Sequence, residues 1–191
     1  KKRCEEVGAL LILDEIQPGM GRTGKLFAFM DHGIVPDILV TGKGLGGGLP
    51  VGAFIASQHH MAQLKEAPSL GHITTFGGNP VIAAACRATL STVLNSNLMA
   101  ETLEKEQLFR SLLIHNKIKE IRGKGLMLAL IMDSKEATQQ LVKQAVENGV
   151  LLFFLLFEPK AVRISPPLTI SKTQIKYACK KILHVLDDLN C

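Results

Sequence analysis

A lysine and an aspartate, each following an apolar run, stand where they could act together in amine chemistry. Lys43 lies between two glycines after the run Ile38–Thr41. A lysine among small residues at the end of a buried strand is partly desolvated, which lowers the pKa of its amine and frees the nitrogen as a nucleophile. Asp14 follows the run Ala9–Leu13, where a carboxylate could accept a hydrogen bond from a protonated pyridine-type ring nitrogen. Together the two residues predict Schiff-base chemistry, although alone Lys43 could be a solvated turn residue and Asp14 a loop-start cap.

The glycines around Lys43 also allow a second interpretation. Residues Gly42–Gly47 match the dinucleotide fingerprint G-x-G-x-x-G, and Glu66 follows about 20 residues later, as that fingerprint requires. A nicotinamide-dependent oxidoreductase would need a helix from Gly47 onward, since the helix N-terminus holds the pyrophosphate. The segment Pro50–Ser57 instead has the pattern of a strand, so nucleotide binding is the less favoured alternative.

The elements that must position these residues can be read from the first half of the chain. Apolar runs predict buried strands over residues 9–13, 38–41 and 50–57. The short connection between the second and third strands implies that they are antiparallel. Asn79-Pro80 has the form of a helix start, with Asn as the cap and Pro in the first turn, and predicts a helix over 81–94. The opening residues Lys1–Gly8 resemble the end of a helix.

The second half predicts a separate α/β domain. A helix is expected over residues 98–116 and a strand over 126–132. The pattern Asp133-x-x-Glu136 resembles a capping box and predicts the start of a second helix, which ends at Gly149. Strands over 150–157 and 161–165 follow, and Ser171-x-x-Gln174 predicts the cap of the last helix. We therefore expect part of a large domain over 1–97, a connecting helix over 98–117 and a small domain over 118–191.

Composition excludes several classes of protein. With 191 residues, 47% hydrophobic and 20% charged, the chain can form a core. Its net charge of +5 is scattered, and 5% aromatic residues with no Trp leave little for base stacking, so no nucleic-acid partner is expected. The longest apolar run, 150–157, is far shorter than the roughly 20 residues of a membrane span. The cysteines and histidines lack the spacing of metal ligands, which predicts no metal site and reduced thiols in the cytoplasm.

Four ordered motifs carry a specific resemblance. They are Leu13-Asp-Glu-Ile-Gln-Pro-Gly-Met-Gly-Arg-Thr-Gly-Lys25, Pro36-Asp-Ile38, Gly42-Lys-Gly-Leu-Gly-Gly-Gly48 and Thr74-Thr-Phe-Gly-Gly-Asn-Pro80. In this order and spacing, the chain resembles the class III, or omega, aminotransferases, over nearly its whole length. The resemblance implies an α/β chain with the aspartate aminotransferase-type fold (fold type I) and pyridoxal 5′-phosphate as cofactor.

The resemblance also implies a role for each matching residue. Lys43 matches the lysine that forms the Schiff base with the cofactor and then shuttles a proton. Asp14 matches the aspartate that keeps the pyridine nitrogen protonated, and Gln17 matches the glutamine beside the phenolic oxygen. Thr75 matches the threonine that reaches the phosphate held by the other subunit of a homodimer with a shared active site. Arg163 matches the arginine that contacts a substrate carboxylate, and its alternation with apolar neighbours puts it on the polar face of a strand.

The activity implied is transfer of the terminal amino group of an ornithine-, acetylornithine- or 4-aminobutyrate-like ω-amino acid to 2-oxoglutarate. Members of the family are roughly twice as long, and the chain begins at Lys1 rather than Met. We therefore expect it to correspond to the C-terminal half of such an enzyme. The alternative is that the chain is catalytically silent and serves as a dimerisation or folding unit.

Overall fold

The computed structural model of the chain describes residues 1–69 and 71–189, which divide into two units. The first unit contains residues 1–21 and 25–97, and the second contains 22–24 and 98–191. None of the helices in the described ranges combines the length and hydrophobicity that a membrane span requires. Cys4, Cys86 and Cys179 are free thiols, whereas Cys191 lies outside the described residues.

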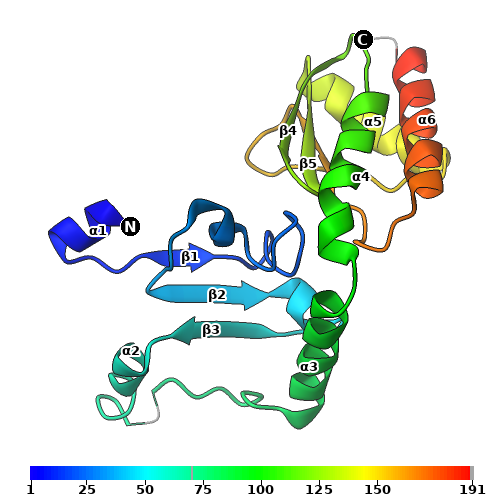
Figure 1. Cartoon of the computed structure of the whole chain (residues 1–191). Helices are drawn as coiled ribbons and strands as arrows, with labels where there is room; N and C mark the ends of the chain where they lie inside the picture. The colour runs from blue at the N-terminus through cyan, green and yellow to red at the C-terminus, as the bar shows by residue number, and fades with distance from the viewer. Residues whose placement is uncertain (70, 190–191) are drawn as a thin grey trace. The chain divides into compact units, whose positions relative to one another are not determined.

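A three-stranded sheet forms the centre of the first unit, in the order β1-β2-β3 (Figure 1). The strands are β1 (Ile12–Asp14), β2 (Ile38–Gly42) and β3 (Gly52–Ala56). The pair β1 and β2 is parallel, with Asp14 in register with Val40, and β3 is antiparallel to β2, as the short connection predicted. The expectation that the first strand is buried on both faces is wrong for the described residues, since Ile12 in β1 is exposed.

Short helices and one long helix complete the first unit. They are α1 (Lys2–Val7), the 3-10 helices η1 (Ala28–His32) and η2 (Lys43–Gly46), α2 (Gln58–Ala62) and α3 (Pro80–Leu94). The predicted start of α3 is confirmed: the Asn79 side chain accepts hydrogen bonds from Val81 N and Ile82 N, and Pro80 is in the first turn. In Figure 1, α3 lies at the end of the sheet where β2 runs into η2.

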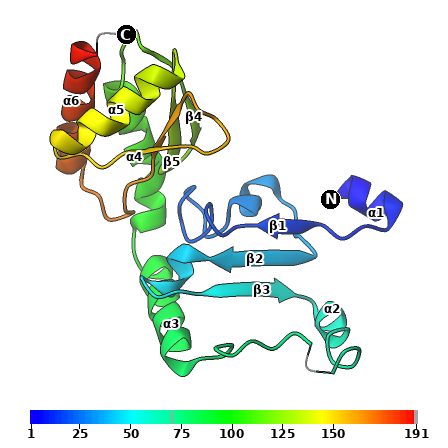
Figure 2. The same cartoon turned by 180° about the vertical axis from the view of Figure 1, so that it is seen from behind.

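The second unit is a four-stranded antiparallel sheet with three helices (Figure 2). Its strand order is β4-β5-β7-β6, with β4 (Ile118–Lys124), β5 (Met127–Met132), β7 (Ala161–Ile164) and β6 (Phe153–Phe154). The helices are α4 (Leu98–Leu112), α5 (Lys135–Glu147) and α6 (Lys172–Asp188). Leu128, Leu130 and Met132 point from β5 into a core formed with these helices. Their alternation with half-buried residues is that of a sheet with one covered face.

Local signals in the second half are partly confirmed and partly corrected. The capping box of α6, formed by Ser171 and Gln174, is present. The helix α5 is capped by Ser134, whose hydroxyl accepts a hydrogen bond from Ala137 N, so the prediction of Asp133 as the cap is wrong. The first helix ends at Leu112 rather than at residue 116, and β4 was not predicted. The run 150–157 is not a buried strand, since only β6 is extended in this segment and Phe157 is 99% exposed.

Candidate active site

Lys43 lies where β2 turns into η2. Its φ is 41°, in the left-handed region that non-glycine residues rarely adopt. Such a conformation costs about 1–3 kcal/mol and clusters at functional sites, where the surrounding structure maintains it. The side chain is exposed, so the desolvation expected from its small neighbours is not provided by the described residues. Lys43 is therefore held in a defined backbone conformation with its amine open to a ligand.

The glycines after Lys43 allow its loop to pack closely. A Cβ on Gly46 would lie 2.9 Å from Val51 Cγ1, and a Cβ on Gly47 would lie 2.3 Å from Thr89 Oγ1 on α3. Both distances are shorter than side chains tolerate, so glycine is required for steric reasons. Residues 47–51 are not helical and lead into β3. The nucleotide-binding alternative is therefore wrong, because its fingerprint must open a helix at this point.

Asp14 ends β1 at the same edge of the sheet at which β2 reaches Lys43. The two strands are parallel and hydrogen-bonded neighbours, so their carboxyl ends meet at that edge. The Asp14 carboxylate is exposed, and its Oδ1 accepts a hydrogen bond from Ile16 N at 2.9 Å. Gln17 follows in the same loop and is also exposed. The parallel pairing therefore brings an amine and a carboxylate to one edge, with an amide on the loop that follows.

Glu15 is a residue of the site region to which sequence reasoning assigned no role. Its side chain is 3% exposed, and its carboxylate oxygens accept hydrogen bonds from Ala28 N at 2.9 Å and Phe29 N at 2.8 Å. A carboxylate at the start of η1 satisfies amides that the helix itself leaves free. Asp14 and Glu15 thus have different roles. The Asp14 carboxylate is open to a ligand, whereas the Glu15 carboxylate anchors the loop that contains Gln17.

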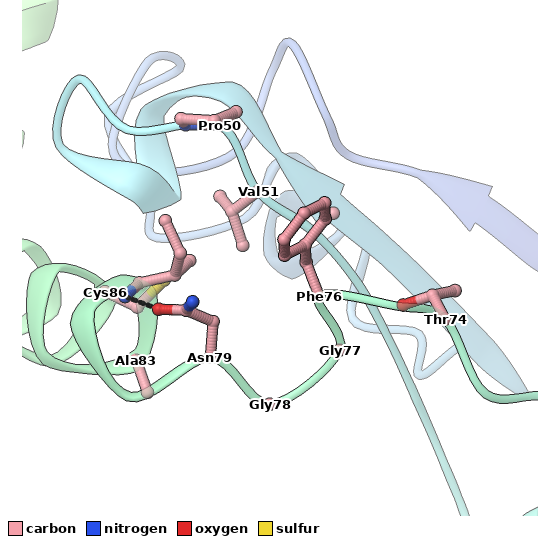
Figure 3. Close-up of a pocket in the computed structure, with 11 residues that line it drawn as sticks. Pro50, Val51, Thr74, Phe76, Gly77, Gly78, Asn79, Ala83 and Cys86 are labelled. Atoms are coloured by element: carbon pink, nitrogen blue, oxygen red, sulfur yellow. Dashed lines mark hydrogen bonds between the residues drawn. The ribbon is translucent and has the colours of Figure 1, made fainter.

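Thr75 lies in the exposed segment before α3, next to an apolar cavity of about 580 Å³ (Figure 3). In Figure 3 the Phe76 ring and Val51 stand on one side of this cavity, and Asn79 accepts its hydrogen bond from the helix on the other. The half-buried Cys86 lines it as well. Its lining residues include no charged side chain, and neither Lys43 nor Asp14 is among them. This cavity is therefore not at the amine and carboxylate.

Arg163 belongs to the second unit, on β7. Its neighbours Val162 and Ile164 are buried in the core, whereas Arg163 is half-buried, which confirms the predicted alternation. The guanidinium carbon lies 5.2 Å from the centre of the Phe153 ring. The Nε atom is buried and has no hydrogen-bond partner among the described residues. A cavity of about 130 Å³, lined in part by Arg163, Phe153 and Ser165, lies beside it.

The described residues hold no metal-binding cluster, since none of their His, Cys, Asp and Glu side chains form a group of three or more that could bind an ion. The structure thus brings Asp14 and Lys43 to one edge of the first sheet. Arg163 lies in the other unit, next to its own cavity. The chemistry that these residues offer is that of an amine, a carboxylate and a guanidinium.

Comparisons with known proteins identify the family of the chain. The family model for class III aminotransferases matches residues 1–186. A putrescine aminotransferase of Pectobacterium atrosepticum is 43% identical over 98% of this chain and 41% of its own length. The ornithine aminotransferase of Toxoplasma gondii ME49 has a TM-score of 0.88 and 33% identity over 97% of this chain and 45% of its own. An acetylornithine aminotransferase of Elizabethkingia anophelis has a TM-score of 0.87 and 35% identity, over 98% and 48% respectively.

The chain therefore spans about half the length, or less, of the relatives that it matches. These structural neighbours are fold type I enzymes, and the chain has part of that fold. The match extends through both units.

Proposed function

Because the chain belongs to the class III aminotransferases, a family that depends on pyridoxal 5′-phosphate, we propose that it takes part in amino transfer from the terminal amine of an ω-amino acid to 2-oxoglutarate. One observation carries the proposal: Asp14 ends β1 and Lys43 directly follows β2, so both residues lie at the carboxyl ends of two neighbouring parallel strands. The substrate class is supported by the names of the relatives, which act on putrescine, ornithine and acetylornithine. Each of these molecules has a terminal primary amine.

The described residues fit the cofactor in the chemistry of their groups. When bound, pyridoxal phosphate supplies a ring that accepts electrons from the substrate carbon that loses its proton. Lys43 Nζ, exposed on a backbone held in the left-handed region, provides the amine for the covalent link to the cofactor. The same Nζ of Lys43 would also accept and return the proton at the reacting carbon of the substrate. The exposed Asp14 carboxylate keeps the ring nitrogen protonated.

Three other residues bind and orient the cofactor or the substrate. Gln17, on the loop after Asp14, donates a hydrogen bond from its amide to the phenolic oxygen of the cofactor. Thr75, in the exposed segment before α3, contacts the cofactor phosphate held by a second subunit, so the proposal includes a homodimer. Arg163 pairs with a carboxylate of the substrate, for which its guanidinium has a suitable planar geometry. Its buried Nε, without a partner in the described residues, supports this role.

The test is covalent labelling of Lys43. The 191-residue chain is incubated with pyridoxal phosphate, followed by visible absorbance, reduced with borohydride and digested for mass spectrometry. We expect an absorbance band near the edge of the visible range and a phosphopyridoxyl group on the peptide that contains Lys43. Lys43→Ala should lose both signals, whereas Lys25→Ala, which removes an exposed lysine of the same unit, should keep both. Labelling of other lysines in Lys43→Ala at the wild-type level would contradict the assignment.

The same experiment separates a second candidate function. Since the chain spans about half of its relatives, it could serve as a catalytically silent dimerisation or folding unit. In that case the wild-type chain gives no absorbance band and no label on Lys43, although it still belongs to the family.

A further inference from the structure

Phe153 and Arg163 face each other across the edge of the second sheet. The two residues are register partners in the antiparallel pair β6 and β7. Register partners in such a pair have their Cβ atoms about 4.5–5.5 Å apart, so their side chains interact directly. Here the guanidinium carbon lies over the phenyl ring, 5.2 Å from its centre. This distance is within the roughly 6 Å over which an aromatic face attracts a cation.

The placement of Phe153 is not explained by core packing. Its side chain is 47% exposed, and Phe154, the next residue on the same strand, is 57% exposed. The buried core residues of the second unit come from β5, β7, the helices and four leucines outside these elements (Leu113, Leu126, Leu152 and Leu189), and Phe153 is not among them. The contact that distinguishes Phe153 from its neighbour is the one with the guanidinium.

The guanidinium that Phe153 covers still has an unused donor. Arg163 Nε is buried and has no hydrogen-bond partner among the described residues. A buried donor without a partner is costly, typically by about 1–3 kcal/mol, unless a ligand satisfies it. The cavity of about 130 Å³ beside it is lined by Arg163 and Phe153 together with apolar residues and Ser165. Both partners of the contact therefore border a space that a small ligand group could enter.

We propose that Phe153 is a positioning residue for Arg163, which it holds so that the guanidinium edge, and not its face, meets a substrate carboxylate. The inference rests on the proposed role of Arg163 in carboxylate binding. Stacking on the ring occupies one face of the planar guanidinium and limits its rotation. The N–H groups at the edge then remain for a bidentate pair with the two carboxylate oxygens. The exposed methylenes of a dicarboxylate would meet the apolar wall that Phe153 provides.

The experiment uses the Nε–H signals of the 15N-labelled 191-residue chain in proton–nitrogen correlation spectra. Arg163→Lys identifies the signal of Arg163 by its loss. The ring of Phe153 should shift the Arg163 Hε resonance upfield, and glutarate is then titrated in to measure a dissociation constant from the same signal. Phe153→Leu removes the ring but keeps an apolar side chain, and Phe153→Tyr keeps the ring. Phe154→Leu is the matched control on the same strand.

We expect Phe153→Leu to move the Arg163 Hε resonance downfield and to weaken glutarate binding by about fivefold, a typical effect of losing one cation–π contact. Phe153→Tyr and Phe154→Leu should both behave like the wild type. Arg110 serves as an internal check of folding, since its Nε donates to Glu106 Oε1 at 2.9 Å and its signal should stay in place in every variant.

Two results would overturn the inference in different ways. If Phe153→Leu binds glutarate as tightly as the wild type, the positioning role fails while the proposed function stands. If the wild-type Arg163 signal does not respond to glutarate, the carboxylate-binding role of Arg163 fails, and the inference fails with it. Neither result depends on Lys43 or on the cofactor, so the labelling experiment tests the remainder of the proposed function independently.

Discussion

Substituting Gly47 by alanine should loosen the loop that holds Lys43. Gly47 ends η2 in the left-handed conformation, with φ 58° and ψ 29°. An added Cβ would lie 2.3 Å from Thr89 Oγ1 on α3. Alanine at this position therefore lowers stability in two ways, through the strained backbone conformation and through steric overlap with Thr89. Relief of the overlap requires either that Thr89 rotates and loses the hydrogen bond from its Oγ1 to Ala85 O, or that η2 and α3 separate. Lys43 is the first residue of η2.

The two costs can be estimated and separated. A left-handed backbone costs a non-glycine residue about 1–2 kcal/mol, and overpacking typically adds about 1–3 kcal/mol. Gly33→Ala is the matched control: Gly33 ends η1 with φ 62° and ψ 24°, and its Cβ would have no neighbour within 4 Å. Gly33→Ala should therefore show only the backbone cost. In Gly47→Ala/Thr89→Ala the hydroxyl is absent, and the next contact, to the residue 89 Cβ at 3.7 Å, is an ordinary one.

Native-state hydrogen exchange is the suitable assay, because two units need not unfold in one transition. The amides of residues 44–49 and of α3 should exchange roughly 30- to 4,000-fold faster in Gly47→Ala, which corresponds to about 2–5 kcal/mol of lost local stability. In the double variant Gly47→Ala/Thr89→Ala, most of the local stability that Gly47→Ala loses through steric overlap should be regained. Equal effects of Gly47→Ala and Gly33→Ala, or no recovery on removing the Thr89 hydroxyl, would refute the steric argument.

Two further predictions concern the second unit. Ser134→Ala should lower the local stability of α5 by about 1 kcal/mol, because Ser134 caps this helix. Asp133→Ala should cost less, since its ion pair with Lys119 is exposed. Native-state hydrogen exchange of the α5 amides measures both effects, and the opposite ranking would restore Asp133 as the cap. Burial raises the pKa of the Cys179 thiol from 9.0 to about 12. Iodoacetamide at pH 8 should therefore leave Cys179 unmodified in the native chain and modify it in urea. Because the pKa of Cys179 is higher in the folded state, the contribution of this thiol to stability is full below pH 9. It falls by up to about 4 kcal/mol as the pH rises towards 12. Stability should therefore depend less steeply on pH in Cys179→Ala over that range, and an equal slope would exclude Cys179 as the cause of the pH dependence.

Elements with local causes were predicted well. The cap of α3 at Asn79 and the capping box of α6 at Ser171 and Gln174 depend on hydrogen bonds within four residues, so the sequence contains all of the partners. The antiparallel turn between β2 and β3 is local in the same sense, since nine residues separate the two strands. Such signals do not depend on what the rest of the chain does.

Predictions failed where two neighbouring residues could both cap a helix, or where pairing with a distant strand decided the conformation of a segment. Asp133 and Ser134 are both competent caps, and the extended backbone of Ser134, with φ −142° and ψ 163°, selected the serine. The apolar run 150–157 satisfies the pattern of a buried strand. However, β6 is an edge strand of its sheet and, within the described part of the chain, pairs with β7 alone. Hydrophobicity alone could not show that most of the run would lie outside the sheet.

The residue types and their order determined the chemistry that could be expected: a lysine among glycines, an aspartate after an apolar run, and an arginine that alternates with buried residues. Tertiary structure decided which of these groups become neighbours, because strand order and register join residues far apart in the chain. The parallel pairing of β1 and β2 places Asp14 and Lys43 at one edge. The register of β6 on β7 likewise places Phe153 opposite Arg163. The Glu15 carboxylate accepts hydrogen bonds from backbone amides 13 and 14 residues away, and this long-range contact fixes its structural role.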